Sequence, residues 1–205
     1  MKNFAITGMA RTGTKFLANT MDLSPTWTVT HEGGEKWIEL RKSAQAIQKR
    51  FGRDYVGDVS NYTRFAIADL DVRRKGVILR SPKEIWISLD AKRKSAYGGK
   101  APASKRAQDF RRFREAIPHV LNLARRPDIL AIDFKRMTSD VAYLQGIFDY
   151  FGIDDVTITQ SMVDVPINNA PGVERVTLKS FGEAIRTEVR RLEMMHRNAV
   201  KAIWK

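Results

Sequence analysis

A short segment near the start of the chain combines glycines, hydroxyl side chains and cations, which are the residue types that bind a phosphate or sulfate group. The segment GMARTGTK covers residues 8–15 and follows a short apolar run. Its two glycines allow a tight turn, so several backbone amides can point at one anion. Arg11 and Lys15 add positive charge, and a helix that begins at Thr14 would add the positive end of its dipole. The spacing predicts an anion-binding loop, with an ordinary strand-to-helix turn as the alternative.

The loop differs from that of nucleoside triphosphatases. Their phosphate-binding loop places Lys and then Ser or Thr directly after the second glycine. Here Thr14 comes first and Lys15 second. A kinase would also need an aspartate at the end of a buried strand to hold Mg²⁺, and Asp69 or Asp133 could supply it. A P-loop nucleotide or small-molecule kinase is therefore the first alternative function.

A second segment, GVILRSPKEIWIS (residues 76–88), has the pattern of a strand followed by a helix. The strand ends at Arg80, Pro82 opens the helix, and Ser88 lies eight residues beyond the arginine. A guanidinium group can hold a phosphate through two parallel hydrogen bonds. This segment alone favours a surface salt bridge, and only together with the first loop does it predict a second anion contact at Arg80.

Both segments belong to an alternation of β-rich runs and helical patterns, which predicts an α/β fold. The expected strands are residues 3–7, 27–30, 55–59, 76–79 and 129–132, and the expected helices are residues 14–21, 35–51, 83–94, 104–124 and 140–151. We predict a single three-layer, P-loop-like domain over residues 1–205, with a central parallel sheet of about five strands and an amphipathic C-terminal helix at about 180–204. In such sheets, ligands bind beyond the carboxyl ends of the strands.

The composition indicates a soluble, strongly basic protein. There are 36 Lys and Arg against 23 Asp and Glu, a formal net charge of +13. Residues 73–126 alone hold 16 Lys and Arg against 4 Asp and Glu, which favours an anionic ligand or partner. The chain has no cysteine, no apolar run long enough to cross a bilayer and no signal peptide, so we predict a cytoplasmic protein. A non-catalytic anion- or nucleic-acid-binding protein is the second alternative, although no stacking cluster of aromatics accompanies the charge.

Taken together, the segments resemble the sulfotransferases that use 3′-phosphoadenosine-5′-phosphosulfate (PAPS). GMARTGTKFL is similar to the 5′-phosphosulfate loop of that family, and RSPKEIWIS is similar to its 3′-phosphate motif. Residues 129–153, ILAIDFKRMTSDVAYLQGIFDYFGI, resemble the segment that closes its nucleotide-binding core. The resemblance spans about residues 4–153. It implies PAPS as donor, adenosine 3′,5′-bisphosphate as product, no metal, and transfer of a sulfuryl group to a hydroxyl or amine.

The resemblance also implies roles for individual residues. The donor-binding set is Arg11, Thr12, Gly13, Thr14, Lys15, Phe16, Arg80 and Ser88, with Arg175 and Lys179 as candidates in a late loop over the nucleotide. Arg11 and Lys15 would stabilise charge on the oxygen that bridges phosphorus and sulfur. Lys15 departs from the family pattern, where Ser or Thr is commoner, so the resemblance leaves open which of the two cations faces that oxygen.

The acceptor's proton needs a base, and the second predicted strand leads directly into His31 and Glu32. A carboxylate or an imidazole within hydrogen-bonding reach of the acceptor can take the proton. Glu32 is the first choice and His31 the second, and a polar turn is the alternative. Asp58, Ser60, Asn61 and Tyr62, at the third strand, are candidates for acceptor binding or residues of an ordinary loop. The acceptor itself, whether a small molecule, a glycan or a peptide, is left open.

Overall fold

The computed structural model of the chain describes residues 2–32, 55–98 and 102–164. Within these residues the chain divides into two compact units, of which the first holds residues 2–32, 55–80 and 108–164 and the second holds residues 81–98 and 102–107. The helices predicted at residues 35–51 and 180–204 lie outside the described residues, as do Arg175 and Lys179. The prediction of one domain over the whole chain stays a prediction.

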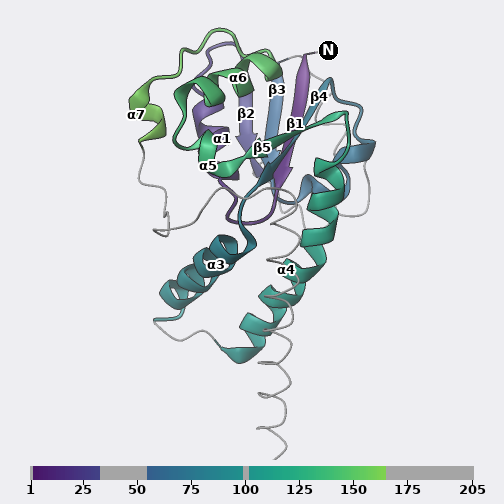
Figure 1. Cartoon of the computed structure of the whole chain (residues 1–205), viewed down its shortest axis with the longest axis vertical. Coiled ribbons are helices and arrows are strands. Elements are labelled where there is room, and N and C mark those ends of the chain that lie inside the picture. The colour runs from purple at the N-terminus through teal and green to yellow at the C-terminus, as the bar shows by residue number, and fades with distance from the viewer. Residues whose placement is uncertain (1, 33–54, 99–101, 165–205) are drawn as a thin grey trace, which may run out of the picture. The chain divides into compact units, whose positions relative to one another are not determined.

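A five-stranded parallel sheet forms the first unit, which confirms the predicted fold class (Figure 1). The strands are β1 (Asn3–Gly8), β2 (Thr28–His31), β3 (Val56–Ser60), β4 (Arg74–Leu79) and β5 (Ile129–Asp133). Their order across the sheet is β2-β3-β1-β4-β5, and all four pairings are parallel. Every residue of the central strand β1 is buried, as expected for a strand that is covered on both faces.

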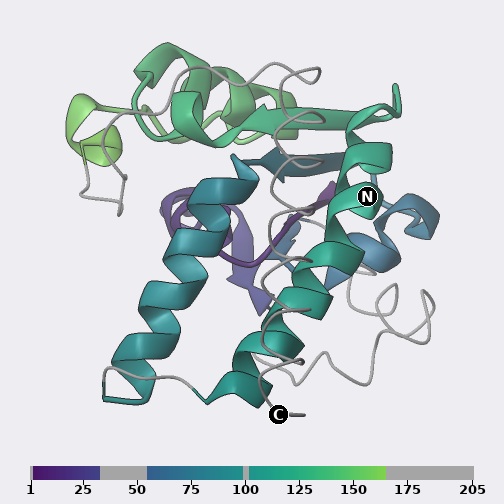
Figure 2. The ribbon, with the colours of Figure 1, turned by 60° about the horizontal axis from the view of Figure 1, so that its bottom comes forward.

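Among the described elements, three helices cover one face of the sheet, and two short 3-10 helices with part of a long helix cover the opposite face (Figures 1 and 2). The first layer holds α1 (Thr14–Met21), α5 (Phe134–Met137) and α6 (Val141–Phe151), and α7 (Gln160–Val163) follows. The second layer holds the short 3-10 helices η4 (Thr63–Phe65) and η5 (Ile67–Asp69) and the later part of α4 (Ala103–Ala124). The ring of His119 in α4 lies 5.0 Å from that of Phe65 in η4, so this histidine is a packing residue.

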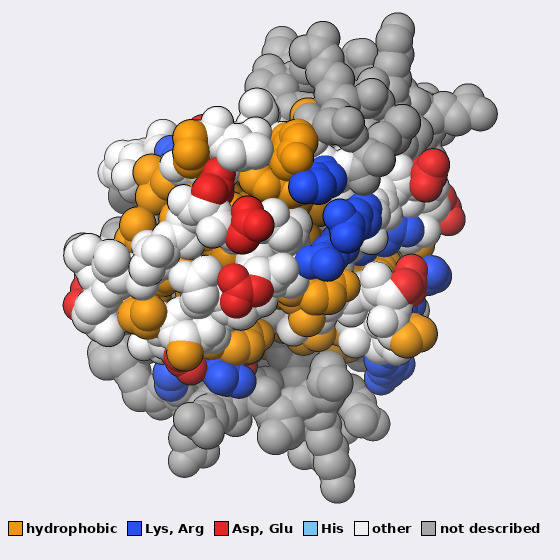
Figure 3. Space-filling model, turned by 90° about the horizontal axis from the view of Figure 1, so that it is seen from above, with side chains coloured by type: hydrophobic (Ala, Val, Ile, Leu, Met, Phe, Trp, Pro, Cys, Tyr) orange, Lys and Arg blue, Asp and Glu red, His pale blue; other side chains and the backbone are white. Residues whose placement is uncertain are grey.

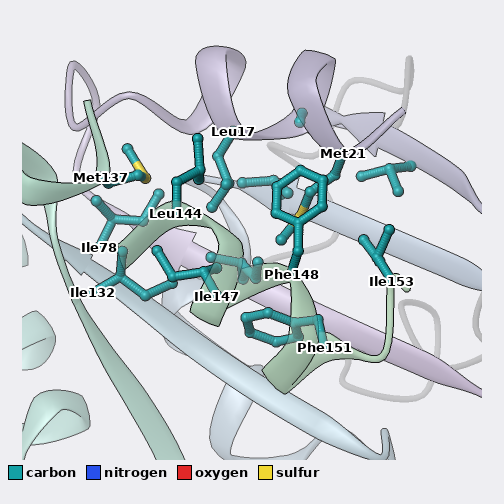
Figure 4. Packing of buried hydrophobic residues seen from close by; sticks show 14 of the residues in the cluster. Leu17, Met21, Ile78, Ile132, Met137, Leu144, Ile147, Phe148, Phe151 and Ile153 are labelled. Carbon is teal, nitrogen blue, oxygen red and sulfur yellow. The ribbon is translucent and has the colours of Figure 1, made fainter. Parts of the chain in front are cut away.

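The main hydrophobic core lies between the sheet and the layer of α1, α5 and α6 (Figure 4). Side chains of α6 such as Leu144 and Phe148 meet Leu17 and Met21 of α1, and all four are fully buried. Burying a side chain of this size contributes about 1.5–3 kcal/mol relative to leaving it exposed. The core therefore fixes α1, and with it the loop that precedes α1.

Every predicted strand differs from the observed one by one or two residues, and the largest difference is at β4. Strand β4 begins at Arg74, two residues before the predicted Gly76, because the charged residues have partners: Arg74 donates to the Asp149 carbonyl at 3.1 Å, and Lys75 donates to the Ala68 carbonyl at 2.8 Å. Strand β3 extends to Ser60, one residue beyond its predicted end. None of the described helices is both long and apolar enough to cross a membrane.

The second unit contains α3 (Pro82–Ala96) and the start of α4. Helix α3 begins at Pro82, as the sequence predicts, because proline suits the first turn of a helix. An ion pair with 3.3 Å between Arg106 Nε and Asp90 Oδ1 joins the two segments of this unit. Ser88 is buried, with 8% of its surface exposed.

Candidate functional site

The predicted anion loop, Arg80 and the His31–Glu32 pair all follow strands whose carboxyl ends meet at one edge of the sheet. The loop follows β1, Arg80 follows β4, and His31 is the last residue of β2. Because all the strands are parallel, these ends share one edge, as predicted. Hydrogen bonds then connect the loop to Arg80 and to His31.

The loop at residues 9–13 has unusual backbone angles, which are held by hydrogen bonds within the loop and by packing against Phe134. Arg11 and Gly13 both have positive φ angles, 72° and 85°. Thr12 is fully buried, and both its amide and its hydroxyl donate to the Met9 carbonyl, at 3.2 and 2.7 Å. Gly13 lies so close to the ring of Phe134 that a Cβ atom there would be 2.8 Å from it. These contacts therefore preorganise the loop for the predicted binding of an anion.

Arg80 links β4 to this loop. It is buried, with 7% of its surface exposed, and its Nη1 donates to the carbonyl oxygen of Arg11 at 2.8 Å. Its guanidinium lies over the ring of Phe134, 4.1 Å from the centroid. The prediction that Arg80 belongs with the anion loop agrees with this contact, while a joint phosphate contact with Ser88 stays a prediction.

His31 connects the loop to the candidate base. Its Nε2 is 3.1 Å from the hydroxyl oxygen of Thr14, the first residue of α1. The same nitrogen lies 3.7 Å from Glu32 Oε1, and Asn61 donates a hydrogen bond from its side-chain amide to that carboxylate oxygen. Glu32 has a positive φ of 58°, which is uncommon for residues other than glycine. The pair is thus part of a chain of contacts that begins at the anion loop.

Burial lowers the pKa of His31 below its ordinary value of 6.5. The Glu32 carboxylate opposes this shift, and the Lys15 ammonium adds to it. His31 is therefore neutral at neutral pH, which leaves the imidazole able to accept a proton. The influence of Lys15 also shows that its charge lies within electrostatic reach of the pair.

This shift makes folding stability depend on pH. Below pH 6.5 the unfolded chain binds a proton at His31 that the folded chain resists, so the free energy of unfolding decreases as pH falls from 6.5 toward the folded-state pKa. We expect His31→Gln to reduce this loss. Urea unfolding of the parent and of His31→Gln at pH 7.5 and 5.5 measures the decrease in the free energy of unfolding. His119→Gln is the control for the loss of a histidine. Equal decreases in the parent and His31→Gln would contradict the prediction.

The loop also predicts a costly substitution at Gly13. Gly13→Ala would place a side chain at φ 85°, a conformation that costs about 1–2 kcal/mol for residues other than glycine, and would press a methyl group on Phe134. Gly152→Ala is a matched control, since Gly152 has φ 79° and open space around its Cβ position. We expect Gly13→Ala to lower the free energy of unfolding more than Gly152→Ala does, by urea denaturation. Equal losses of unfolding free energy in the two variants would show that Phe134 moves aside without cost, and would contradict the prediction.

Several predicted site residues make internal contacts. The hydroxyls of Thr12 and Thr14 bond to Met9 and His31, as described, and Phe16 packs against the hydrophobic core. Asp58 and Ser60 both lie within β3, although the predicted strand stopped one residue before Ser60, and both are fully buried. The hydroxyl of Thr30 donates to Asp58 Oδ1 at 2.8 Å, and Ser60 Oγ accepts from the amide of Tyr62 at 3.1 Å.

The sequence motifs do not identify two residues of the site. Phe134 contacts both Gly13 and Arg80, yet the motif comparison treated its segment only as the closing part of the core. Its position directly after β5, the strand beside β4, was the available signal. Arg64 is buried and donates to the backbone carbonyl of Asn61, the residue that holds Glu32. No spacing in the sequence indicates this contact.

Positive charge also gathers at the other end of the sheet. Figure 3 shows a band of Lys and Arg side chains beside separate Asp and Glu side chains, at the end where the strands begin. Lys2, Arg73 and Arg74 stand at the starts of β1 and β4. Part of this charge has local partners, since Lys2 lies 4.8 Å from the ring of Tyr55 and Arg74 lies 5.1 Å from that of Tyr150. The basic composition is therefore not confined to the candidate site.

Comparison with known proteins supports the fold. No family model and no curated protein matches the sequence. Among solved structures, the chain is similar to a sulfotransferase from Alicyclobacillus acidocaldarius, with a TM-score of 0.56 and 18% sequence identity over 81% of this chain and 87% of that one. Within the described residues, no three His, Asp or Glu side chains are grouped so that they could hold a metal ion. The chain thus has the α/β fold that this sulfotransferase structure also has.

Proposed function

We propose that this protein transfers a sulfuryl group from PAPS to a hydroxyl or amine of an acceptor. The observation that carries the proposal is the contact between Thr14, at the end of the anion loop, and His31, beside Glu32. It places a candidate base next to a candidate site for an anionic donor. The fold likeness and the two motifs support the same function, and the Arg80–Ser88 motif has no role in a kinase.

The donor loop has the features that a phosphosulfate group requires. Helix α1 has no side-chain cap, because Gly13 stands at its N-cap, and its first turn holds no acidic residue. Its first amide groups and its positive dipole end suit an anion. Arg11 and Lys15 supply two cations on either side of Gly13. We assign the 5′-phosphosulfate to residues 12–15 and the 3′-phosphate to Arg80 and Ser88, with Arg175 and Lys179 as candidates for covering the nucleotide.

Glu32 then acts as the general base. It takes the proton from the acceptor while the acceptor's oxygen or nitrogen bonds to sulfur and the bond from sulfur to the bridging oxygen breaks. Lys15 and Arg11 stabilise the negative charge that grows on the bridging oxygen of the departing adenosine 3′,5′-bisphosphate. His31 ties the base to the loop through Thr14, and it is the second choice for the base itself.

The contacts refine the proposed acceptor site. Asn61 holds the carboxylate of Glu32, so its main role is to orient the base. Asp58 and Ser60 are fully buried, whereas Tyr62 is half-buried at the start of η4. We therefore place the acceptor near Tyr62 and Asn61. The acceptor is a small molecule, a glycan or a peptide.

Thermal shift with three ligands tests the function. A ligand at 100 times its dissociation constant stabilises by about 2.7 kcal/mol, which raises the Tm of a chain of this size by about 5–10 °C. Adenosine 3′,5′-bisphosphate without metal is expected to give this shift. Stabilisation by ATP with Mg²⁺ and none by the bisphosphate would favour a kinase. Binding of duplex DNA that falls steeply with salt, with no effect of either nucleotide, would favour a nucleic-acid-binding protein.

A further inference from the structure

Three segments that are distant in the sequence meet behind the anion loop. Arg80 follows β4, Phe134 follows β5, and Arg11 lies in the loop after β1. The guanidinium of Arg80 is buried between the other two, with 2.8 Å from its Nη1 to the Arg11 carbonyl and 4.1 Å from its central carbon to the Phe134 ring centroid. The same ring contacts the backbone at Gly13. Arg80 and Phe134 thus touch the loop at two points, two residues apart.

The loop needs such support because its backbone is unfavourable on its own. Arg11 adopts a φ of 72°, a left-handed conformation that costs about 1–2 kcal/mol for a residue with a side chain. Residues hold such angles only where surrounding contacts fix them. The hydrogen bond from Arg80 ends on the carbonyl of this strained residue. A charged donor makes that bond stronger than one between neutral groups.

We propose that Arg80 is a positioning residue for the 5′-phosphosulfate loop, held in place by the ring of Phe134. The proposal rests on the proposed function and deepens it, because Arg80 then serves both ends of the donor. Its Nη1 fixes the loop that receives the 5′ group, and the proposed function gives the same side chain the contact with the 3′-phosphate. A residue that only binds the 3′-phosphate would not need the contact with Arg11.

The first measurement uses the ligand-free protein, so it does not depend on the function. Hydrogen exchange by NMR reports the local opening of the loop through the amide of Thr12, which donates to Met9. In Arg80→Ala we expect Thr12 to exchange about tenfold faster or more, the effect of losing one charge-assisted hydrogen bond, while Ile6 in β1 is unchanged. Unchanged exchange at Thr12, or an equal rise at both amides, overturns the proposal.

Arg74 offers a matched control. It is also an arginine of β4, it donates to a backbone carbonyl, that of Asp149 at 3.1 Å, and its guanidinium lies 5.1 Å from the ring of Tyr150. It stands at the start of the strand, away from the loop. Arg74→Ala should leave Thr12 exchange unchanged. If Arg80→Ala does not fold, Arg80→Lys replaces it, since a lysine keeps the charge but loses the planar group that stacks on Phe134.

The second measurement separates the two roles of Arg80. Adenosine 5′-phosphosulfate lacks the 3′-phosphate, and adenosine 3′,5′-bisphosphate carries it. By calorimetry, we expect Arg80→Ala to weaken binding of both ligands about tenfold or more, and Arg74→Ala to weaken neither. If Arg80→Ala binds adenosine 5′-phosphosulfate as tightly as the parent does, Arg80 acts on the 3′-phosphate alone and the proposal is wrong. If the parent binds neither ligand, the proposed function fails, and the exchange measurement still decides the role of Arg80.

Discussion

Glu32→Gln is expected to lower turnover by about 10²- to 10⁴-fold, the usual effect of losing a general base. The substitution keeps the size of the side chain, and its amide oxygen can still accept the hydrogen bond from Asn61. It removes the basic carboxylate, so the acceptor's proton has no receiver. Donor affinity should stay nearly the same, because the contacts of Glu32 with His31 and of His31 with Thr14 place the carboxylate beside the loop rather than within it. Single-turnover kinetics at saturating donor, once an acceptor is identified, measures the rate.

Glu115→Gln is the matched control, since Glu115 is an exposed glutamate of α4 in the same unit. It should retain the parental rate. If Glu32→Gln also retains the parental rate while His31→Ala abolishes turnover, His31 is the base and the assignment of Glu32 is wrong. If neither substitution changes the rate, the pair has only a structural role in the turn after β2.

Lys15→Ala is expected to lower turnover by about 10²- to 10³-fold, the effect of removing one preorganised group that stabilises charge in the transition state. Lys15 is exposed in the first turn of α1, and its charge contributes to the lowered pKa of His31. It therefore lies near both the proposed phosphosulfate site and the base. Donor binding should weaken as well, because the same charge acts in the ground state. Single-turnover kinetics and calorimetry measure the two effects separately.

Two further variants sharpen this prediction. Arg125→Ala removes one exposed positive charge after α4 and should leave both quantities unchanged. Arg11→Ala should cost less turnover than Lys15→Ala, because the charge of Lys15 also acts on His31. A larger loss of turnover in Arg11→Ala would identify Arg11 as the cation at the bridging oxygen.

The fold was predictable because its signals are local. Apolar runs followed by glycine or proline mark the ends of β1 and the start of α3, and their alternation with helical patterns indicates a parallel sheet. The errors in the strand bounds occur where a residue's hydrogen-bond partner is distant in the sequence, so that the local composition does not indicate it. Nothing near Arg74 shows that the Asp149 carbonyl will receive its hydrogen bond, so the start of β4 was placed too late.

The candidate site was predictable only as a set of strand ends. Parallel topology brings the loop, Arg80 and His31 to one edge, and the motif spacing identifies each of them. The contacts between them depend on side-chain geometry that no spacing encodes. The bond from Arg80 to a carbonyl and the position of Phe134 against Gly13 are of this kind.

The contact of Phe134 with Gly13 has a consequence for the order in which the protein is made. The ring that supports the loop is synthesised about 120 residues after the loop itself. At about 5–20 residues per second, this interval lasts roughly 6–24 seconds. During that time the nascent chain carries the loop without its aromatic support. The proposed donor nucleotide would therefore stabilise the supported form of the loop only once β5 and Phe134 have been synthesised.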